Sequence, residues 1–263
     1  MSDQDVPGLD LAPRPAAAPL RRMIAAQAVM ETRLLLRNGE QLVLALVIPL
    51  LVLVAGTKSG DVVDLGSGSR IDILAPGVLA LAILSTSFAS LAIATGFERR
   101  YEVLKLLGSS PLPRSGLLAG KTAAVLAVEV LQLTVLAAAA LLLGWEPAGG
   151  PAAVAWLVLV VLLGTSAFGG LGLLLAGVLR AEATLAAANL VYVLLLLGGA
   201  VVVPMARYPE SAQPFLELLP SAALSDAIRT VLDGGGPGAT PVVVLLVWAV
   251  AAALAVGRTF RWE

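Results

Sequence analysis

Six long apolar stretches, separated by short charged segments, dominate this sequence of 263 residues. A helix needs roughly 20 mostly apolar residues to cross the hydrocarbon core of a membrane, which is about 30 Å thick. The stretches are continuously apolar and therefore lack the alternation that membrane-spanning strands require. They predict an all-α membrane protein with six transmembrane helices, over Gln41 to Thr57, Ile73 to Phe97, Gly116 to Leu143, Ala152 to Leu179, Thr184 to Val203 and Thr240 to Gly257.

The composition excludes several kinds of chemistry. Hydrophobic residues make up 59% of the chain, which contains neither cysteine nor histidine. Without them there are no disulfides, no thiolate chemistry and none of the commonest zinc or haem ligands. We therefore expect no metal site and no cofactor bound by this chain. The net charge of -1 gives no reason to expect nucleic acid as a partner.

The basic residues indicate the orientation. With the N-terminus placed in the cytoplasm, 13 of the 17 Lys and Arg lie on that side, and those left outside are Lys58, Arg70, Arg207 and Arg229. Positive residues close to a span resist translocation, so this bias sets the topology. We expect both termini in the cytoplasm, a disordered tail over residues 1–19 that is rich in proline and acids, and one transmembrane domain over 20–263.

The segment from Leu20 to Arg37, just before the first span, has an amphipathic helical period. The arginines that gather on one side are Arg22, Arg33 and Arg37. This pattern predicts an interfacial helix in the inner headgroup layer, with its arginines toward phosphate or water. A helix that only anchors the chain is the alternative. Gln27 and Glu31 interrupt the apolar face, which indicates a polar contact there.

The most charged segment of the chain runs from Glu98 to Lys121, between the second and third spans. Helical composition from Glu98 to Leu107, followed by Gly108 and two prolines, predicts a short helix and then a turn. Such a charged projection suits docking on a soluble partner. The residues that we assign to this contact are Glu98, Arg99, Arg100, Glu102 and Lys105. A solvated basic loop that only sets the orientation is the alternative.

One motif resembles a phosphate-binding loop without matching it. Gly116, Gly120, Lys121 and Thr122 spell G-x-x-x-G-K-T, which is one residue too short, and no buried strand precedes them. We therefore expect no nucleotide binding by this chain. If ATP drives its function, another subunit must hydrolyse it.

Prolines divide the segment between the fifth and sixth spans. Pro204, Pro209 and Pro220 punctuate it, and the sequence predicts two short helices, Glu210 to Leu219 and Ser221 to Asp233. These pieces are too rich in leucine for a free external loop. We expect them to re-enter the outer leaflet with their backbone groups bonded within the protein. A structured outer loop is the alternative.

Four polar residues inside the spans are candidates for a translocation path: Glu129, Gln132, Asn189 and Tyr192. Glu129 is an acid within a span, and such groups mark functional sites by default. Helical spacing places Glu129 and Gln132 on one face of their helix, and Asn189 and Tyr192 on one face of theirs. A structural, hydrogen-bonded role is the open alternative for these side chains.

The order of these features resembles the permease subunits of bacterial type-2 ATP-binding-cassette exporters, of the drug-resistance and antibiotic-export kind. The resemblance covers the chain from Leu20 to Arg261. The residues that carry it are Glu31, Arg37, Asn38 and Pro49, then Pro111, Leu112, Pro113 and Arg114, and finally Pro204, Pro220, Ala227, Ile228 and Arg229.

The resemblance implies a multi-pass subunit in the bacterial cytoplasmic membrane, with an interfacial helix, a coupling helix and re-entrant outer helices. By resemblance, the helix from Glu98 to Leu107 would be the coupling helix, seated on a separate nucleotide-binding ATPase subunit that holds ATP and Mg²⁺. The family pattern also implies a second permease subunit, identical or a sister chain, and surrounding membrane lipids. Arg180 to Ala183 is very short for a cytoplasmic element of this family, so any second contact with the ATPase must be small.

This resemblance implies a transport subunit and not an enzyme. Its cargo would be a hydrophobic or lipid-like molecule, such as a drug, an antibiotic, a lipid or a glycolipid, that moves outward. A secondary transporter, a channel and a non-transporting membrane scaffold are the rival classes. A secondary transporter would need more ion ligands within the spans, and a channel would need a filter or a charged ring.

Overall fold

The computed structural model of the chain describes residues 17–58 and 69–259, and within these ranges every regular element is a helix. Five of these helices are long and apolar enough to cross a membrane. A further helix, α2 (Gly39–Lys58), contains the first predicted span and has a shorter apolar stretch, Ala45–Lys58. The predicted all-α membrane class is confirmed. Most of the expected disordered tail, residues 1–16, lies outside the described residues.

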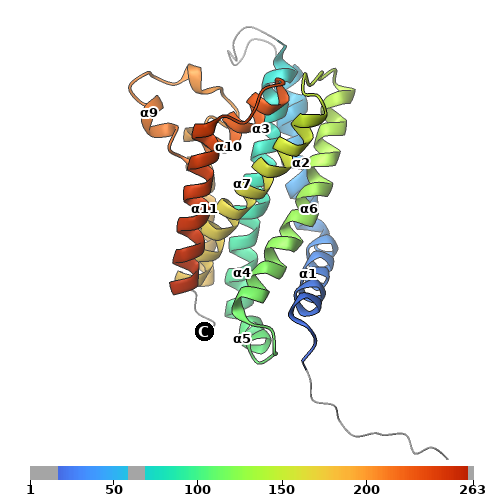
Figure 1. Cartoon of the computed structure of the whole chain (residues 1–263), viewed down its shortest axis with the longest axis vertical. Coiled ribbons are helices and arrows are strands. Elements are labelled where there is room, and N and C mark those ends of the chain that lie inside the picture. Colours follow the sequence, from blue (N-terminus) through green and yellow to red (C-terminus); the bar gives the residue numbers. More distant parts are fainter. Residues whose placement is uncertain (1–16, 59–68, 260–263) are drawn as a thin grey trace, which may run out of the picture.

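The long helices run back and forth along one axis (Figure 1). The second span is a continuous helix in three parts, α3 (Arg70–Ile83), a π-helical segment η2 (Leu84–Ser90) and α4 (Leu91–Arg100). The other spans are α6 (Arg114–Leu142), α7 (Pro151–Val178), α8 (Ala181–Gly198) and α11 (Ala239–Thr259). The first and last described residues therefore lie at the same end of the bundle, which is called the α5 end below.

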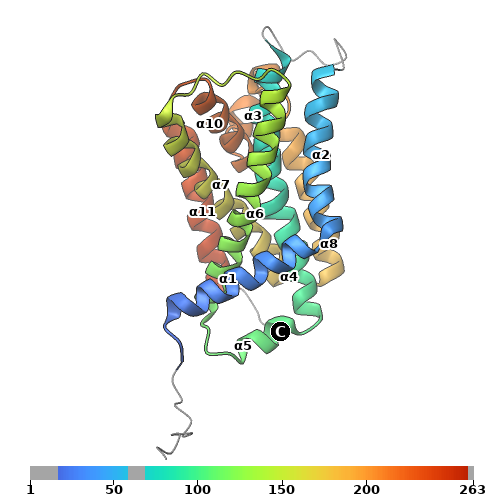
Figure 2. The same cartoon turned by 90° about the vertical axis from the view of Figure 1, so that its right-hand side faces the viewer.

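The helix α1 (Leu20–Arg37) has the predicted bounds and lies crosswise to the spans at the α5 end (Figure 2). It packs on the start of α6 and also contacts α2. Gln27 and Glu31 are its buried residues, whereas Leu20 and Leu34 are exposed. The face of α1 that turns toward the protein is therefore polar at its centre, as the interruption of the apolar pattern predicts.

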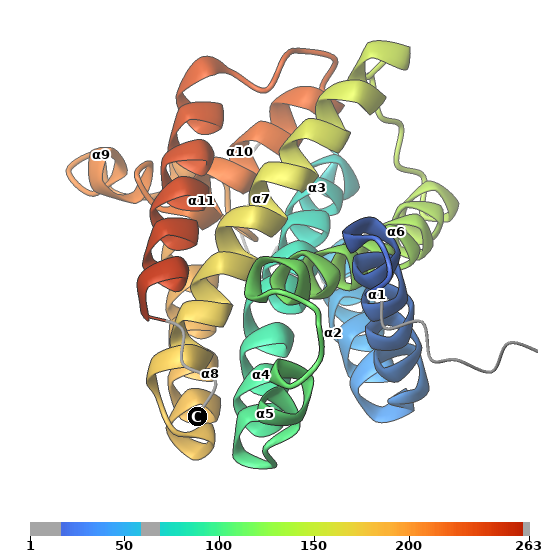
Figure 3. The ribbon, with the colours of Figure 1, turned by 60° about the horizontal axis from the view of Figure 1, so that its bottom comes forward.

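The helix α5 (Val103–Gly108) lies beside α4 at this end (Figure 3). The prediction of one helix from Glu98 to Leu107 is wrong, because α4 continues to Arg100 and the chain then turns at Glu102, whose φ of 58° is left-handed. The turn allows Leu104, which is 0% exposed, to enter an apolar cluster formed by α4, α6, α7 and α11. Burial of this leucine outweighs the local preference for a straight helix.

The opposite end carries η3 (Met205–Arg207), α9 (Gln213–Leu216) and α10 (Pro220–Leu232). α8 ends at Gly198, short of the predicted Val203, because Gly199 and the left-handed Ala200, with φ 50°, reverse the chain. The first predicted outer helix is reduced to α9, which projects from the bundle (Figure 1), whereas the second matches α10 closely. α10 packs on α3, α7 and α11.

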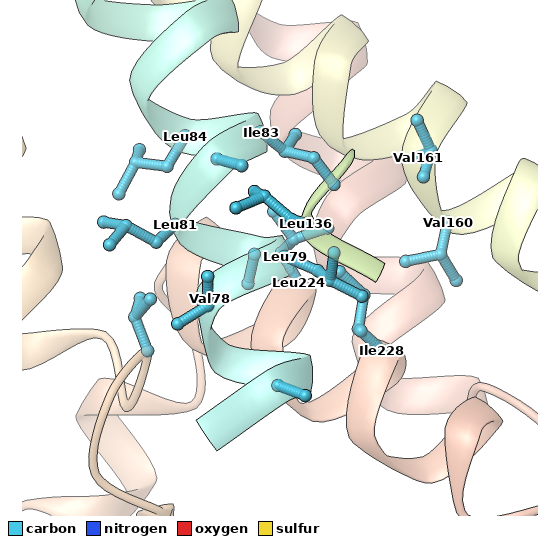
Figure 4. Packing of buried hydrophobic residues seen from close by; sticks show 14 of the residues in the cluster. Val78, Leu79, Leu81, Ile83, Leu84, Leu136, Val160, Val161, Leu224 and Ile228 are labelled. Carbon is cyan, nitrogen blue, oxygen red and sulfur yellow. The ribbon is translucent and has the colours of Figure 1, made fainter. Parts of the chain in front are cut away.

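The core lies around α3. Figure 4 shows side chains of α3 meeting Leu136 from α6, Val160 and Val161 from α7, and Leu224 and Ile228 from α10. Lipid tails are as apolar as leucine, so association of membrane helices relies on close packing rather than on the hydrophobic effect. The near-complete burial of α3 therefore fixes the positions of the helices around it.

Candidate functional site

A small surface of mixed character projects at the α5 end. Its exposed members, called the α5 surface below, are Tyr101, Glu102, Val103, Lys105 and Leu106. Leu106 is 73% exposed and Tyr101 is 69% exposed. Two large side chains, Tyr101 and Leu106, are thus exposed next to the charges of Glu102 and Lys105. Leu104 anchors the surface from below, so the helix is presented as a fixed element.

Only two of the five residues predicted to contact a partner lie on the α5 surface. Glu102 and Lys105 belong to it, with their charged atoms 4.0 Å apart. Glu98, Arg99 and Arg100 form the last turn of α4, and their side chains bond other helices of the same chain. Docking of the α5 surface on a partner stays a prediction.

Glu98 belongs to a buried ion cluster. The Lys121 ammonium donates to Glu98 Oε2 at 2.6 Å and to Glu31 Oε1 at 2.8 Å, and Gln27 donates to the same Glu31 oxygen at 2.8 Å. The Lys121 side chain is only 2% exposed. This is the polar contact expected at Gln27 and Glu31, and it joins α1, α4 and α6 at one point.

The same lysine explains the motif that resembles a phosphate-binding loop. Gly116 to Thr122 lies inside α6, and no loop surrounds it. A Cβ at Gly120 would meet the side chain of Gln27, which shows that this glycine provides room for α1. The motif is therefore a packing feature in which the lysine pairs two carboxylates.

Arg99 and Arg100 hold the turn between α7 and α8. Arg99 donates to Gly177 O in the last turn of α7 at 2.7 Å, and also to the carbonyl oxygen of Leu179, the C-cap of that helix. A cation at the C-terminus of a helix satisfies such carbonyls and interacts favourably with the helix dipole. Arg100 pairs with Glu182 in the first turn of α8, where both side chains are largely exposed.

The interfacial residues divide between two faces of α1. Arg22, Arg33 and Arg37 are exposed, on the side where the amphipathic period predicts them. Glu31 is buried and pairs with Lys121. The placement of the three arginines against phosphate stays a prediction, whereas Glu31 has a partner within the chain.

The four candidates for a translocation path fall into two groups, of which Glu129 and Gln132 form the first. Glu129 is 0% exposed and accepts a hydrogen bond from Thr165 of α7. Gln132 is 2% exposed, accepts from Thr86 at 2.7 Å and donates to Ala45 O of α2 at 2.7 Å. Both side chains bond one helix to another inside the bundle, and a place for them on a translocation path stays a prediction.

Sequence reasoning missed the π-helical segment η2. Its polar side chains face neighbouring helices and its own backbone: Thr86 bonds Gln132, and Ser87 donates to Ile83 O. A π turn is wider than an α turn and often occurs at functional sites. The run Leu84-Ser-Thr-Ser-Phe-Ala-Ser90 is unusually polar for the middle of a span, and this was the available signal.

Asn189 and Tyr192 line a cavity of about 490 Å³ between α2, the second span and α8. Ser85 and Ser90 supply further polar groups to its wall. A smaller cavity of about 160 Å³ shares Asn38, Ala45 and Ser90 with it and reaches the ion cluster of Glu31, Lys121 and Glu98. The two adjoining cavities thus reach from the ion cluster to Asn189 and Tyr192 of α8, with polar groups set in mainly apolar walls.

At the opposite end Arg229 of α10 fastens the end of α8. It donates to Ala200 O at 2.7 Å, to Val201 O at 2.8 Å and to Ser225 Oγ at 2.8 Å. Burial lowers the pKa of the Arg229 guanidinium to about 10, and the charges of Asp226 and Asp233 oppose this shift. The side chain therefore stays protonated at neutral pH and can make these charge-assisted bonds.

The described residues contain no group of three or more acidic side chains placed to hold a metal ion. Residues 20–232, which run from the start of α1 to the end of α10, match the model of the family described as ABC-2 type transporter. No curated protein matches this chain.

Proposed function

The chain belongs to the ABC-2 type transporter family, and from this membership we propose that it is the permease subunit of an ATP-driven exporter in the bacterial cytoplasmic membrane. A separate ATPase subunit binds ATP and Mg²⁺ and hydrolyses the nucleotide. The cargo is a hydrophobic or lipid-like molecule of the drug, antibiotic, lipid or glycolipid type. The observation that carries the proposal is the family match over α1 to α10, within which the α5 surface projects.

The α5 surface is the contact for the ATPase. Leu106 and Tyr101 expose apolar area beyond the long spans, and Lys105 and Glu102 supply charges at the rim. An anchor of this kind stabilises a complex when a partner pocket removes it from water. Burying Leu106 is worth about 1.5–3 kcal/mol, which corresponds to roughly a tenfold to hundredfold change in affinity.

A second permease subunit covers the side that α2 and α8 form. Asn189 lies at the middle of α8 and is exposed within the described residues. An amide facing lipid without a partner is costly, whereas the same group beside a second subunit or a shared cavity is not. The 490 Å³ cavity beside Asn189 then becomes half of a larger space between two subunits, through which cargo passes.

The transport cycle follows from two arrangements of the same helices. ATP binding closes the paired ATPase subunits, and the α5 surface of each permease moves with its ATPase. ATP binding can shift the equilibrium between the inward and outward arrangements only by the difference in free energy that the ATPase contacts have in the two. Both termini and the α5 surface face the cytoplasm in this proposal, as the distribution of basic residues favours.

Reconstitution tests the proposal. The chain is placed in liposomes together with the ATP-binding-cassette ATPase encoded nearest to it in its genome, and the probe is a fluorescently labelled phospholipid. We expect the ATPase to bind only liposomes that contain the chain, and probe movement to require both subunits and ATP. Leu106→Glu should weaken ATPase binding at least tenfold, while Leu142→Glu, at an exposed position near the opposite end, should not. Probe movement driven by an ion gradient without ATPase would instead support a secondary transporter.

The pairing face is tested separately. Because the chain contains no cysteine, Asn189→Cys creates a single thiol at the proposed interface. A bismaleimide should crosslink this variant into a dimer in the membrane, or to a co-expressed sister permease that carries the matching cysteine. Val154→Cys, exposed on α7, is the matched control and should stay monomeric. A result in which both variants stay monomeric contradicts pairing through α8.

A further inference from the structure

We propose that Glu98, Arg99 and Arg100 are positioning residues that carry the displacement of α5 into the other helices, and that they do not contact the ATPase. This inference rests on the proposed function. The three residues form the last turn of α4, named the α4 terminal turn here. Because successive residues of a helix point about 100° apart, three neighbours in sequence reach three different directions.

The first direction leads to α1 and α6. Glu98 bonds Lys121 at 2.6 Å, and Lys121 also bonds Glu31 of α1 at 2.8 Å. These groups are largely withdrawn from water, with Lys121 2% and Glu31 9% exposed. A buried ion pair resists separation because each partner would be left as an uncompensated charge. The α4 terminal turn, α1 and the start of α6 therefore move together.

The second direction leads to α7. The guanidinium of Arg99 bridges Gly177 O and Leu179 O, so it holds two carbonyl groups at the end of that helix. The planar fork of an arginine fixes distance and direction together, which a lysine cannot do. A shift of the α4 terminal turn is thereby transmitted to the end of α7.

The third direction leads to α8. Arg100 pairs with Glu182 in its first turn, and this pair is exposed and weak by itself. Close packing supports it: a Cβ at Gly96, one turn before Arg100, would lie 3.2–3.4 Å from the atoms of Thr184. Absence of a side chain at Gly96 thus lets α4 and α8 touch where the ion pair also joins them.

Two residues connect this turn to α5. Tyr101 is the C-cap of α4 and the left-handed Glu102 is the N-cap of α5, while the buried Leu104 fixes α5 against the bundle. The connection is too short to absorb a movement of α5. The geometry assigns the side chains of Glu98, Arg99 and Arg100 to bonds within the permease, and the exposed side chains of the α5 surface to the ATPase.

The experiment compares ATPase affinity with transport in the reconstituted complex. For Arg99→Gln we expect the dissociation constant of the ATPase to stay within twofold, while the number of probe lipids moved per ATP falls at least tenfold. Arg99→Lys, which keeps the charge but loses the fork, should give an intermediate ratio. Lys105→Glu on the α5 surface is the matched control and should weaken ATPase binding instead.

A charge swap between Arg100 and Glu182 controls for variants that lose activity because they misfold. Arg100→Glu should lower the ratio of lipid moved to ATP hydrolysed, and adding Glu182→Arg should restore it at least halfway, with equal thermal stability of the two proteins. If Arg99→Gln weakens ATPase binding as Lys105→Glu does, or leaves the ratio unchanged, the inference is wrong. Failure of the unmodified chain to bind any ATPase would instead defeat the proposed function.

Discussion

Replacement of Lys121 by methionine tests the buried ion cluster most directly. The change keeps the length of the side chain and removes the ammonium that lies 2.8 Å from Glu31 and 2.6 Å from Glu98. Two carboxylates then share a nearly closed space without a cation. Removing one partner of a buried ion pair typically costs about 3–5 kcal/mol. Since Glu98 is 22% exposed and keeps some water, we expect about 3 kcal/mol here, at the lower end of that range.

Two further variants distinguish the cost of leaving carboxylates unpaired from the cost of removing the charged groups altogether. Glu98→Gln leaves the pair of Lys121 and Glu31 intact and removes the surplus negative charge, so the expected cost is below about 1 kcal/mol. The triple variant Glu31→Leu, Lys121→Met and Glu98→Leu leaves no stranded charge. Replacing a whole buried ionic group by apolar residues is often neutral or stabilising. We therefore expect the triple variant to be at least as stable as Glu98→Gln.

The free energy of unfolding is measured by titration with sodium dodecyl sulfate, followed through tryptophan fluorescence. Trp145, which is 6% exposed, reports on the loss of packing. Thr122→Val is the matched control, because the hydroxyl of this neighbouring residue bonds only its own helix at Leu118 O. The reasoning is refuted if Lys121→Met loses less than about 1 kcal/mol, or if the triple variant loses as much as the single one.

Three further substitutions have defined outcomes. Gly77→Ala places a methyl group against the backbone oxygen of Val201, and the forced shift should cost about 1–3 kcal/mol in the same titration. Arg229→Gln removes charge-assisted bonds to the Ala200 and Val201 carbonyls, so the link after α8 should become more sensitive to protease, with a loss of about 2–4 kcal/mol. Gln132→Leu should cost about 1 kcal/mol and leave lipid transport per folded protein unchanged, whereas a tenfold loss of transport would return this residue to the translocation path.

Local pattern predicts the helices of this protein well. The bounds of α1 follow from an amphipathic period, and the end of α10 follows from Gly234, whereas α10 starts at Pro220, one residue before the predicted Ser221. These signals act within one or two turns of chain, so they can be read directly from the residues. The break after Arg100 is different, since neither glycine nor proline marks it. It depends on Leu104 reaching an apolar cluster built from four other helices.

The candidate sites are harder to predict from sequence, because they depend on bonds between residues that are far apart along the chain. The sequence shows that Glu31 interrupts an apolar face and that Lys121 lies at the edge of a span, but spacing cannot reveal that residues 90 positions apart are bonded. The charges of Glu98, Arg99 and Arg100 indicate a polar surface when they are read locally. In the folded chain these side chains bond other helices of the same chain, and the α5 surface beside them exposes more apolar area than the charges predict.

The two ends of α8 are held by different parts of the bundle. The buried residues of α8 are Ala181, Thr184 and Ala188, all in its first half, where it packs on α4. Beyond its last turn, Arg229 holds Ala200 and Val201 against α10. Between these fastenings α8 borders the 490 Å³ cavity and has few buried contacts. In the proposed transport cycle, a displacement of the α4 terminal turn would act on the first half of α8, with the contacts of Arg229 as the pivot. In this cycle we therefore expect the cavity to open by a tilt of α8 as a rigid body, without a bend within the helix.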